Sequence, residues 1–432
     1  MNATTDLPPT INGTVAPGFE SVRALYEYNM QNLAEQHTQL CVYHRGEKVV
    51  DLWGSACEPD SFSPDSLINV FSSGKSLEAI ALASLVDKGL LDYQARVCDY
   101  WPGFASNGKQ AVTVADLMRH EAGLAALDGS INPVDLHTHN LKENRVGQII
   151  EQQVQRFRPD SPREYHAITR GWIVNELFRR VDPNGRTIGE FLQEELSGPL
   201  GADVMIGVPE DQLSRVSKVQ VLSLGYQFAQ SFRPRLLNRR TEHNIFGLVT
   251  KIARMAPNFR KRSASKVPPP FTGMNSIGFF NHPDIVRGES PSANANCTAR
   301  GLARVAAMMA QGGEWQGKRF LSQATWDALH DEPVEADMLF GRTTFTQGGV
   351  AHFNTMDRNS NIHERALNHG REGFYGWMGL GGSIFQWHPG QQIGFGYVPT
   401  SLNVLDFVNE RGKAYQTEVL RCVEQRNRQT AV

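Results

Sequence analysis

The spacing of apolar side chains predicts helices and strands near the start of the chain. Residues 12–18, with two glycines and a proline, indicate an irregular opening. An amphipathic helix is then predicted over 19–36, because apolar side chains recur every three or four positions, at Phe19, Val22, Leu25, Tyr26 and Met30. Residues 41–43 and 49–53 predict a β-hairpin, since they are rich in Val and aromatic residues and flank Arg45-Gly46-Glu47. A second helix is expected from about Ser73 to Lys88, followed by a glycine stop.

The middle of the chain is predicted to be mainly helical, and the C-terminal hundred residues return to strands. Helical patterns recur at 114–119, 171–181, 188–196 and 298–311. Residues 382–387 and 393–398 predict another hairpin, and a last helix is expected over about 405–425.

Strands at both ends around a helical middle suggest an α/β (α+β) fold in which an antiparallel sheet is flanked by helices. We expect residues 1–90 and 331–432 to form the sheet domain and residues 91–330 to form an inserted all-helical domain.

Composition adds limits on location and partners. The 432 residues are 40% hydrophobic and 20% charged, with a net charge of −2, which is ordinary for globular domains and argues against a nucleic-acid-binding polycation. No apolar run approaches the ~18 residues of a membrane span, and the first residues lack the pattern of a secretory signal. We therefore expect a cytoplasmic protein whose five widely spaced cysteines stay reduced.

Residues 233–266 differ from the rest of the chain in charge. They hold ten Lys and Arg against one acid, Glu242, and include an apolar helix-like stretch over 245–255. The segment fits either a lid or membrane-surface patch, or a solvated insertion in the helical domain.

The first candidate for chemistry is the pair Ser72 and Lys75, at the start of the second predicted helix. At i, i+3 spacing both side chains face the same way. The positive end of the helix dipole and partial burial both disfavour an ammonium, so Lys75 could become a neutral amine able to take the Ser72 proton. The unsatisfied N–H of Ser72 at the helix start could bind an oxyanion. On its own, however, this spacing also arises by chance.

Competing sites are less consistent with the sequence. It contains no G-x-S-x-G nucleophile elbow and no nucleotide-binding glycine motif. His137 and His139 could share a metal, but the Asp-His expected shortly after them is missing, so a solvated loop is the better interpretation. His120 and His166 could act as bases, yet we expect each to be a hydrogen-bonded structural histidine. Trp172 is expected in the core.

Two later segments extend the Ser72–Lys75 motif into a family resemblance. Glu164-Tyr165-His166-Ala167-Ile168-Thr169-Arg170-Gly171-Trp172 comes about ninety residues after it, and Phe374-Tyr375-Gly376-Trp377-Met378-Gly379-Leu380 opens a predicted strand. This order resembles the serine β-lactamase and penicillin-binding superfamily of class C type. The segments 117–124, 165–172 and 291–303 are similar to its esterase branch, and the resemblance covers roughly residues 16–400.

The resemblance implies a β-lactamase/transpeptidase-like fold and a role for each matching residue. Ser72 would be the acylated nucleophile and Lys75 its proton acceptor. Tyr165 would relay the proton to the leaving group, with its pKa lowered by Lys75. The N–H groups of Ser72 and Leu380 would form the oxyanion hole, and no metal or organic cofactor is implied.

Departures from the family pattern indicate the substrate. Penicillin-recognising members usually have Asn where Ala167 stands, and Lys or His where Trp377 stands, so polar handles for a β-lactam are missing. We expect Trp377, as an apolar wall, together with Gly379 and His166 to contact substrate. The sequence thus favours a serine carboxylesterase acting on small neutral or apolar esters. A β-lactamase or peptidase-type amide hydrolase, an acyltransferase and a noncatalytic binding relative remain alternatives.

Overall fold

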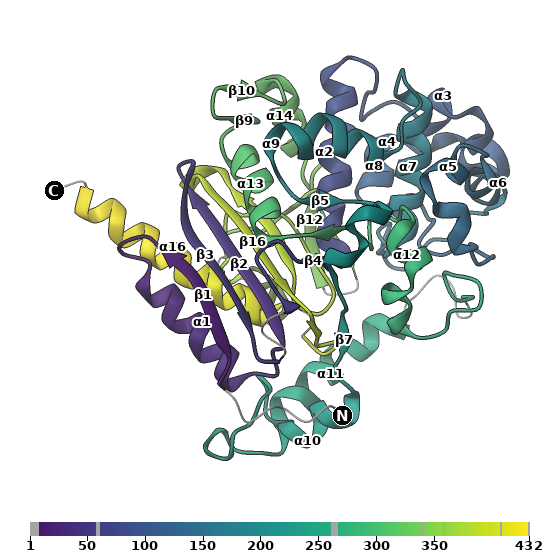
Figure 1. The fold of residues 1–432 in the computed structure, drawn as a ribbon. Helices are drawn as coiled ribbons and strands as arrows, with labels where there is room; N and C mark the ends of the chain where they lie inside the picture. The colour runs from purple at the N-terminus through teal and green to yellow at the C-terminus, as the bar shows by residue number, and fades with distance from the viewer. Residues whose placement is uncertain are drawn as a thin grey trace.

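A nine-stranded antiparallel sheet forms the centre of the computed structural model, which describes residues 8–57, 61–260, 267–338, 341–356, 358, 360–406 and 408–430 (Figure 1). Across the sheet the strands are β1 (Thr10–Val15), β3 (Glu47–Ser55), β2 (His37–His44), β16 (Ile393–Pro399), β15 (Ile384–His388), β14 (Tyr375–Met378), β13 (Ala351–His352), β12 (Gly341–Phe345) and β11 (Val334–Met338). N-terminal β2 pairs with C-terminal β16. The predicted antiparallel sheet built from both ends of the chain is therefore confirmed.

Both predicted hairpins are present. Strands β2 and β3 are joined at Arg45 and Gly46, whose φ values of 52° and 80° are those of a type I′ turn. Strands β15 and β16 are joined through Pro389–Gln391. The strand β1 was not expected, because Asn12-Gly13 reads as a turn. A Cβ on Gly13 would lie 1.9 Å from the Asp51 carbonyl oxygen, so this glycine lets two strands approach each other.

Helices cover both faces of the sheet (Figure 1). On one face α1 (Glu20–Asn32) and α16 (Glu410–Thr430) pack against alternate β2 side chains such as Leu40 and Val42. On the other face lies α13 (Ala299–Ala310), which approaches β16 closely: a Cβ on Gly394 would lie 2.3 Å from the Ala307 nitrogen. Helix α16 begins five residues later than predicted, after a loop that includes β17 (Ser401–Leu402).

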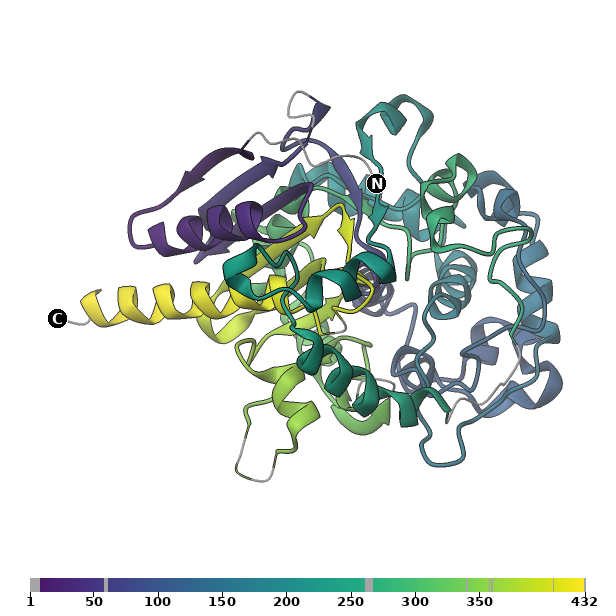
Figure 2. The ribbon, with the colours of Figure 1, turned by 90° about the horizontal axis from the view of Figure 1, so that it is seen from below.

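The remaining helices belong mainly to the middle of the chain, and most of them lie on one side of the sheet (Figure 2). They are α2 (Lys75–Asp87), α3 (Val97–Tyr100), α4 (Val114–Met118), α5 (Thr138–Leu141), α6 (Arg145–Gln152), α7 (Thr169–Val181), α8 (Ile188–Phe191), α9 (Gly198–Leu200), α10 (Leu224–Ser231), α11 (Ile245–Arg260), α12 (Pro283–Arg287), α14 (Gln323–His330) and α15 (Ile362–Asn368). The division at residues 90 and 330 stays a prediction. Helix α13 precedes residue 330 but packs on the sheet.

Short strands connect the sheet to the helical middle. A four-stranded sheet has the order β5 (Val204–Met205), β8 (Asn296–Cys297), β4 (Leu67–Asn69) and β6 (Val216–Ser217). Two further pairs join β7 (Gln220–Val221) to β17, and β9 (Glu314–Trp315) to β10 (Lys318–Arg319). Strand β4 leads directly into the first turn before α2, and so it fixes where that helix begins.

Two findings bear on environment. None of the five cysteines, all within the described residues, forms a disulfide. In the described part of the chain no helix combines the length and the apolar character needed to cross a bilayer.

Candidate active site

Ser72 lies on a sharply bent segment between β4 and α2. The residue before it, Phe71, has a φ of 48°, a left-handed conformation that costs a non-glycine residue roughly 1–2 kcal/mol. Two contacts hold it there: its N–H donates to Asn69 Oδ1 at 2.7 Å, and its ring meets that of Phe280 edge-on at 4.8 Å. Phe71–Gly74 form a 3₁₀ turn that continues into α2, and Ser72 within this turn stays partly exposed. The bend places this serine at the positive end of a helix.

Lys75 is buried directly beside Ser72. Its side chain is 1% exposed, and Nζ lies 3.4 Å from Ser72 Oγ. Nζ also donates to the carbonyl oxygens of Ala167 at 2.7 Å and Ser292 at 3.0 Å. Burial lowers the pKa of Lys75 well below its usual value, and this outweighs the raising effect of Glu78. A neutral amine that donates to both carbonyls has its lone pair left for the Ser72 hydroxyl.

A buried ion pair lies next to Lys75 and binds its backbone. Glu78 and Arg170 are both fully buried and hydrogen-bonded to each other. Arg170 also donates to the Lys75 carbonyl at 3.1 Å, and the Ser292 hydroxyl donates to the Glu78 carboxylate. The pair joins α2 to α7 and binds the carbonyl of Lys75.

Tyr165 reaches the same place from the loop before α7. Its ring centre lies 4.9 Å from Lys75 Nζ. Burial raises the pKa of Tyr165 to about 12, although hydrogen bonds with Ser72 and Trp377 lower it. The expectation that this pKa is lowered is wrong, because burial of the Tyr165 ring outweighs the lowering effects of its hydrogen bonds and of the Arg170 charge. Tyr165 is therefore a protonated phenol, suited to donating a proton.

Trp377 forms a hydrogen bond with Tyr165 and does not present an exposed apolar surface to substrate. Its side chain is 3% exposed and packs against Phe345 and Phe353, and its indole N–H donates to the Tyr165 hydroxyl at 2.9 Å. The expected apolar wall needs correction for this reason: the indole is mostly covered, and its polar edge points at the tyrosine.

The two histidines are structural, as expected, but His166 cannot contact substrate. Its side chain is fully buried; Nε2 accepts the Leu124 N–H at 3.0 Å and Nδ1 lies 2.6 Å from the Glu164 carbonyl. Burial lowers its pKa to about 4, so it is neutral. His120 is also fully buried and accepts the His166 N–H, with its pKa lowered by burial. Together they fix the loop that carries Tyr165.

Glycines allow the separate segments to close around Ser72. A Cβ on Gly74 would lie 2.6 Å from the Pro291 carbonyl oxygen, and one on Gly171 would lie 2.4 Å from the Ser292 nitrogen. A Cβ on Gly379 would lie 2.2 Å from the Val70 carbonyl oxygen. Each of these glycines belongs to one of the segments that carry the sequence motifs, and no larger residue permits the same approach.

The loop that carries Leu380 is attached directly to the nucleophile segment. The Ser383 hydroxyl donates to the Val70 carbonyl at 2.6 Å, and the Ser73 hydroxyl donates to the Ser383 carbonyl at 3.1 Å. The Gly379 N–H donates to the same Ser383 carbonyl at 2.8 Å. Leu380 is thereby held on a tight turn next to residues 70–73, with its side chain 39% exposed.

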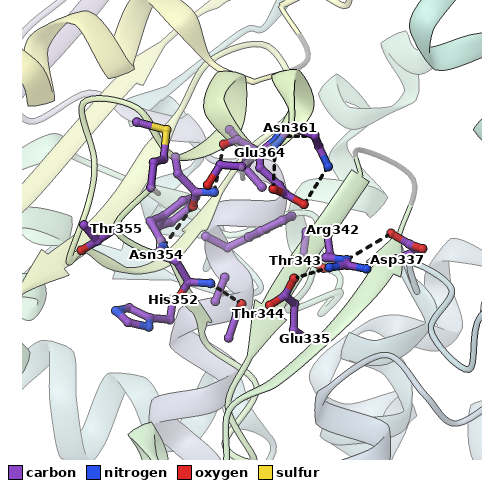
Figure 3. Close-up of a pocket in the computed structure, with 17 residues that line it drawn as sticks. Glu335, Asp337, Arg342, Thr343, Thr344, His352, Asn354, Thr355, Asn361 and Glu364 are labelled. Atoms are coloured by element: carbon purple, nitrogen blue, oxygen red, sulfur yellow. Dashed lines mark hydrogen bonds and ion pairs between the residues drawn. The ribbon is translucent and has the colours of Figure 1, made fainter. Parts of the chain in front are cut away.

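A cavity of about 460 Å³ lies on the other side of Trp377, between β12, β13 and α15 (Figure 3). Ser72 is not among its lining residues. Most of the lining is polar: in Figure 3 Arg342 pairs with Glu335 and Asp337, and the Asn354 side chain donates to the Thr344 hydroxyl.

The competing histidine pair lies elsewhere. His137 and His139 have ring centres 6.1 Å apart, and His137 pairs with Asp284. Within the described ranges, no three His, Cys, Asp or Glu side chains are grouped as a metal site would require. Trp172 is 2% exposed and in the core, as predicted.

Sequence reasoning missed the parts of the site that depend on tertiary contacts. Glu78 continues the i, i+3 series of Ser72 and Lys75 along one face of α2, a spacing that could have indicated it. No comparable sequence pattern indicates that Arg170 is its partner, or that the carbonyls of Ala167 and Ser292 bind the lysine.

Comparisons with known proteins identify relatives of this chain. The family model described as Beta-lactamase matches residues 22–416. The esterase/beta-lactamase LipL of Mycobacterium tuberculosis (strain ATCC 25618 / H37Rv) is 33% identical over 296 residues, which are 66% of this chain and 61% of that protein's length. The match thus spans less than two thirds of this relative.

Solved structures extend the similarity over nearly the whole chain. A family VIII carboxylesterase is 26% identical with a TM-score of 0.75, and a penicillin-binding protein homologue from Caulobacter crescentus is 26% identical with a TM-score of 0.72. Each match covers 96% of this chain and 100% of the other. The predicted β-lactamase/transpeptidase-like fold is confirmed, and the chain belongs to the beta-lactamase family.

Proposed function

We propose that the protein is a serine hydrolase that works through an acyl-enzyme, and specifically a carboxylesterase acting on small neutral esters. The observation that carries this proposal is the buried Lys75, whose amine is bound to two carbonyls and lies 3.4 Å from Ser72 Oγ. A surface lysine would be an ammonium at neutral pH and could accept no proton.

In the proposed acylation, the Ser72 proton passes to Lys75 Nζ while Oγ forms a bond to the ester carbonyl carbon. The negative charge that develops on the carbonyl oxygen is bound by the N–H groups of Ser72 and Leu380. Tyr165 donates its proton to the leaving alcohol oxygen and regains one from the Lys75 ammonium. Water then attacks the acyl-enzyme by the same steps in reverse.

The choice of an ester follows from the groups that the site lacks. Ala167 stands where an amide would hold an acylamino group, and Trp377 stands where a cation would hold a carboxylate. A substrate carboxylate would lose charge-assisted hydrogen bonds worth roughly 1.5–3 kcal/mol each, which is about one to two decades in kcat/KM. A neutral ester has neither an acylamino group nor a carboxylate, so it loses no such hydrogen bond.

A fluorophosphonate probe combined with an aryl ester assay tests the proposal. We expect the wild type to be labelled and to hydrolyse p-nitrophenyl butyrate, and Ser72→Ala to do neither. Ser73→Ala is the control, because the Ser73 hydroxyl is fully buried and bonded to Ser383, so this variant should still be labelled. Labelling of Ser72→Ala, or an unlabelled wild type, contradicts the proposal and favours a binding relative.

A β-lactamase activity is the second candidate, because the relative LipL is named an esterase/beta-lactamase. We expect kcat/KM for neutral short-chain esters to exceed that for nitrocefin by several orders of magnitude. Similar values for both substrates would favour the β-lactamase.

We also propose a cytoplasmic location. The five cysteines without disulfides support it, since thiols persist in a reducing compartment. The test is alkylation with a membrane-impermeant thiol reagent, applied to intact cells and to lysates and detected as a mass shift of the protein. A cytoplasmic protein should be alkylated in lysates and not in intact cells.

A further inference from the structure

Residues 223–250, here called the α10–α11 unit, project from the rest of the molecule. They comprise α10, the start of α11 and the segment between them, at the bottom of Figure 1 and toward the viewer in Figure 2. They include most of the described part of the basic segment 233–266; its last six residues lie outside the described residues. The catalytic proposal makes no use of this unit.

Large apolar side chains are unusually exposed on the unit. Leu236 is 96% exposed and Phe246 is 80% exposed. Phe232, Leu237, Val249 and Leu224 are between 52% and 68% exposed. Single exposed apolar residues are ordinary on protein surfaces, but six within 26 consecutive positions are not.

The charges between these apolar residues are positive. Arg233 and Arg235 are exposed and alternate with the apolar side chains along residues 232–237. The single acid of the unit, Glu242, is turned inward: its side chain is 18% exposed and lies 3.5 Å from the buried Arg411. The outer side of the unit therefore presents apolar and cationic groups together.

The unit is attached to the fold through its polar base, so the exposed groups are not needed to hold it in place. Glu242 accepts a hydrogen bond from Asn403, and His243 pairs with Glu410. Leu248, on the inner side of α11, is 3% exposed. Phe246 and Val249 flank it in sequence but face outward.

We propose that the α10–α11 unit docks onto an anionic lipid surface. Apolar side chains that enter the interface, next to arginines that bind lipid phosphates, are the combination by which peripheral proteins bind such membranes. The base of the unit contacts Asn403 and Glu410, and Leu402, next to Asn403, packs against Gly381 in the loop that carries Leu380. Docking would thus bring the loop beside Ser72 toward the lipid surface. The proposal does not depend on the reaction proposed above.

Flotation of the full-length protein with lipid vesicles tests this. We expect binding to vesicles that contain phosphatidylglycerol and little binding to pure phosphatidylcholine vesicles, with the difference falling as salt is added. The double variant Arg233→Gln/Arg235→Gln should bind the anionic vesicles about 30-fold more weakly, because each Lys or Arg near such a surface contributes about 1 kcal/mol to the binding free energy. Lys318→Gln/Arg428→Gln removes the same charge from exposed sites elsewhere and should bind like the wild type.

A second pair of variants tests the apolar contribution with matched side chains. Phe246→Ser/Val249→Ser should weaken binding at least about tenfold. Phe157→Ser/Val154→Ser changes the same residue types at positions 49% and 50% exposed outside the unit, and should leave binding unchanged. Thermal unfolding of all variants confirms that they fold.

Two outcomes overturn the proposal. One is equal vesicle binding by the unit variants and their controls. The other is a wild-type dimer in light scattering that becomes monomeric in Phe246→Ser/Val249→Ser without any vesicle binding, because the apolar groups would then bind a second copy of the chain.

Discussion

Trp377→Phe isolates one hydrogen bond in the candidate site. The substitution keeps an aromatic ring among Phe345 and Phe353 but removes the indole N–H that donates to the Tyr165 hydroxyl at 2.9 Å. A neutral hydrogen bond of this kind contributes about 1 kcal/mol. If the bond serves to orient Tyr165 for proton donation, its loss slows the proton-donating step about fivefold. Its loss also raises the pKa of Tyr165 further, because that bond lowers it.

The size of this loss in rate depends on the leaving group of the ester. An alkyl alcohol departs only with a proton, whereas p-nitrophenolate departs without one. We therefore expect kcat/KM of Trp377→Phe to fall about fivefold for ethyl butyrate and to stay within roughly twofold for p-nitrophenyl butyrate. Steady-state kinetics with the two esters, at one pH and with matched enzyme concentrations, measure the difference.

Trp172→Phe is a suitable control for Trp377→Phe. Trp172 is equally buried, and its indole N–H donates to the Ser290 hydroxyl at 2.8 Å, away from Tyr165. Both substitutions lose one indole hydrogen bond and similar volume, so both should lower stability, but only Trp377→Phe should separate the two esters. Equal losses on both esters in Trp377→Phe would refute a proton-donating role for Tyr165.

Three further substitutions test the lysine, its support and the closing loop. Lys75→Arg should be as inactive as Lys75→Ala in the p-nitrophenyl butyrate assay, because a guanidinium stays charged in proteins; a near-normal kcat would mean that only charge is needed. Glu78→Gln leaves the buried Arg170 unpaired, and we expect urea titration to show a loss of about 3–5 kcal/mol. Because Glu78 raises the pKa of Lys75, this variant should also shift the acid limb of the kcat/KM pH profile to lower pH, and a shift to higher pH would contradict the assignment. Gly379→Ala should lower kcat at least about 100-fold with a smaller change in KM, since its Cβ would collide with the Val70 carbonyl and displace the proposed oxyanion hole.

The sequence predicts those parts of the site that depend on local geometry. Ser72 and Lys75 lie one helical turn apart, so their proximity follows from the helix alone. The two hairpins of the antiparallel sheet also follow from apolar spacing and turn residues. The same signals do not indicate β11, β12 or β13, and they miss β1, where Gly13 allows two strands to approach closely although its Asn-Gly pair is typical of a turn.

The environment of each side chain could not be predicted in the same way. His166 looks like a candidate substrate contact until its two ring nitrogens are seen to bond Leu124 and Glu164. The pKa of Tyr165 depends on how deeply the chain buries it, which no spacing records. Trp377 has an apolar body and a polar edge, and only the fold decides which of the two faces the site.

The two carbonyls that bind Lys75 have a consequence for how the protein loses activity. Ala167 and Ser292 belong to segments far apart in the sequence, and the direction of the lysine lone pair depends on both. A small displacement of either segment would turn the amine away from Ser72 while leaving the sheet and its helices intact. Esterase activity should therefore be lost at a lower urea concentration than the one at which tryptophan fluorescence changes. Turnover would then report on the alignment of distant parts of the chain more sensitively than a measure of the folded state does.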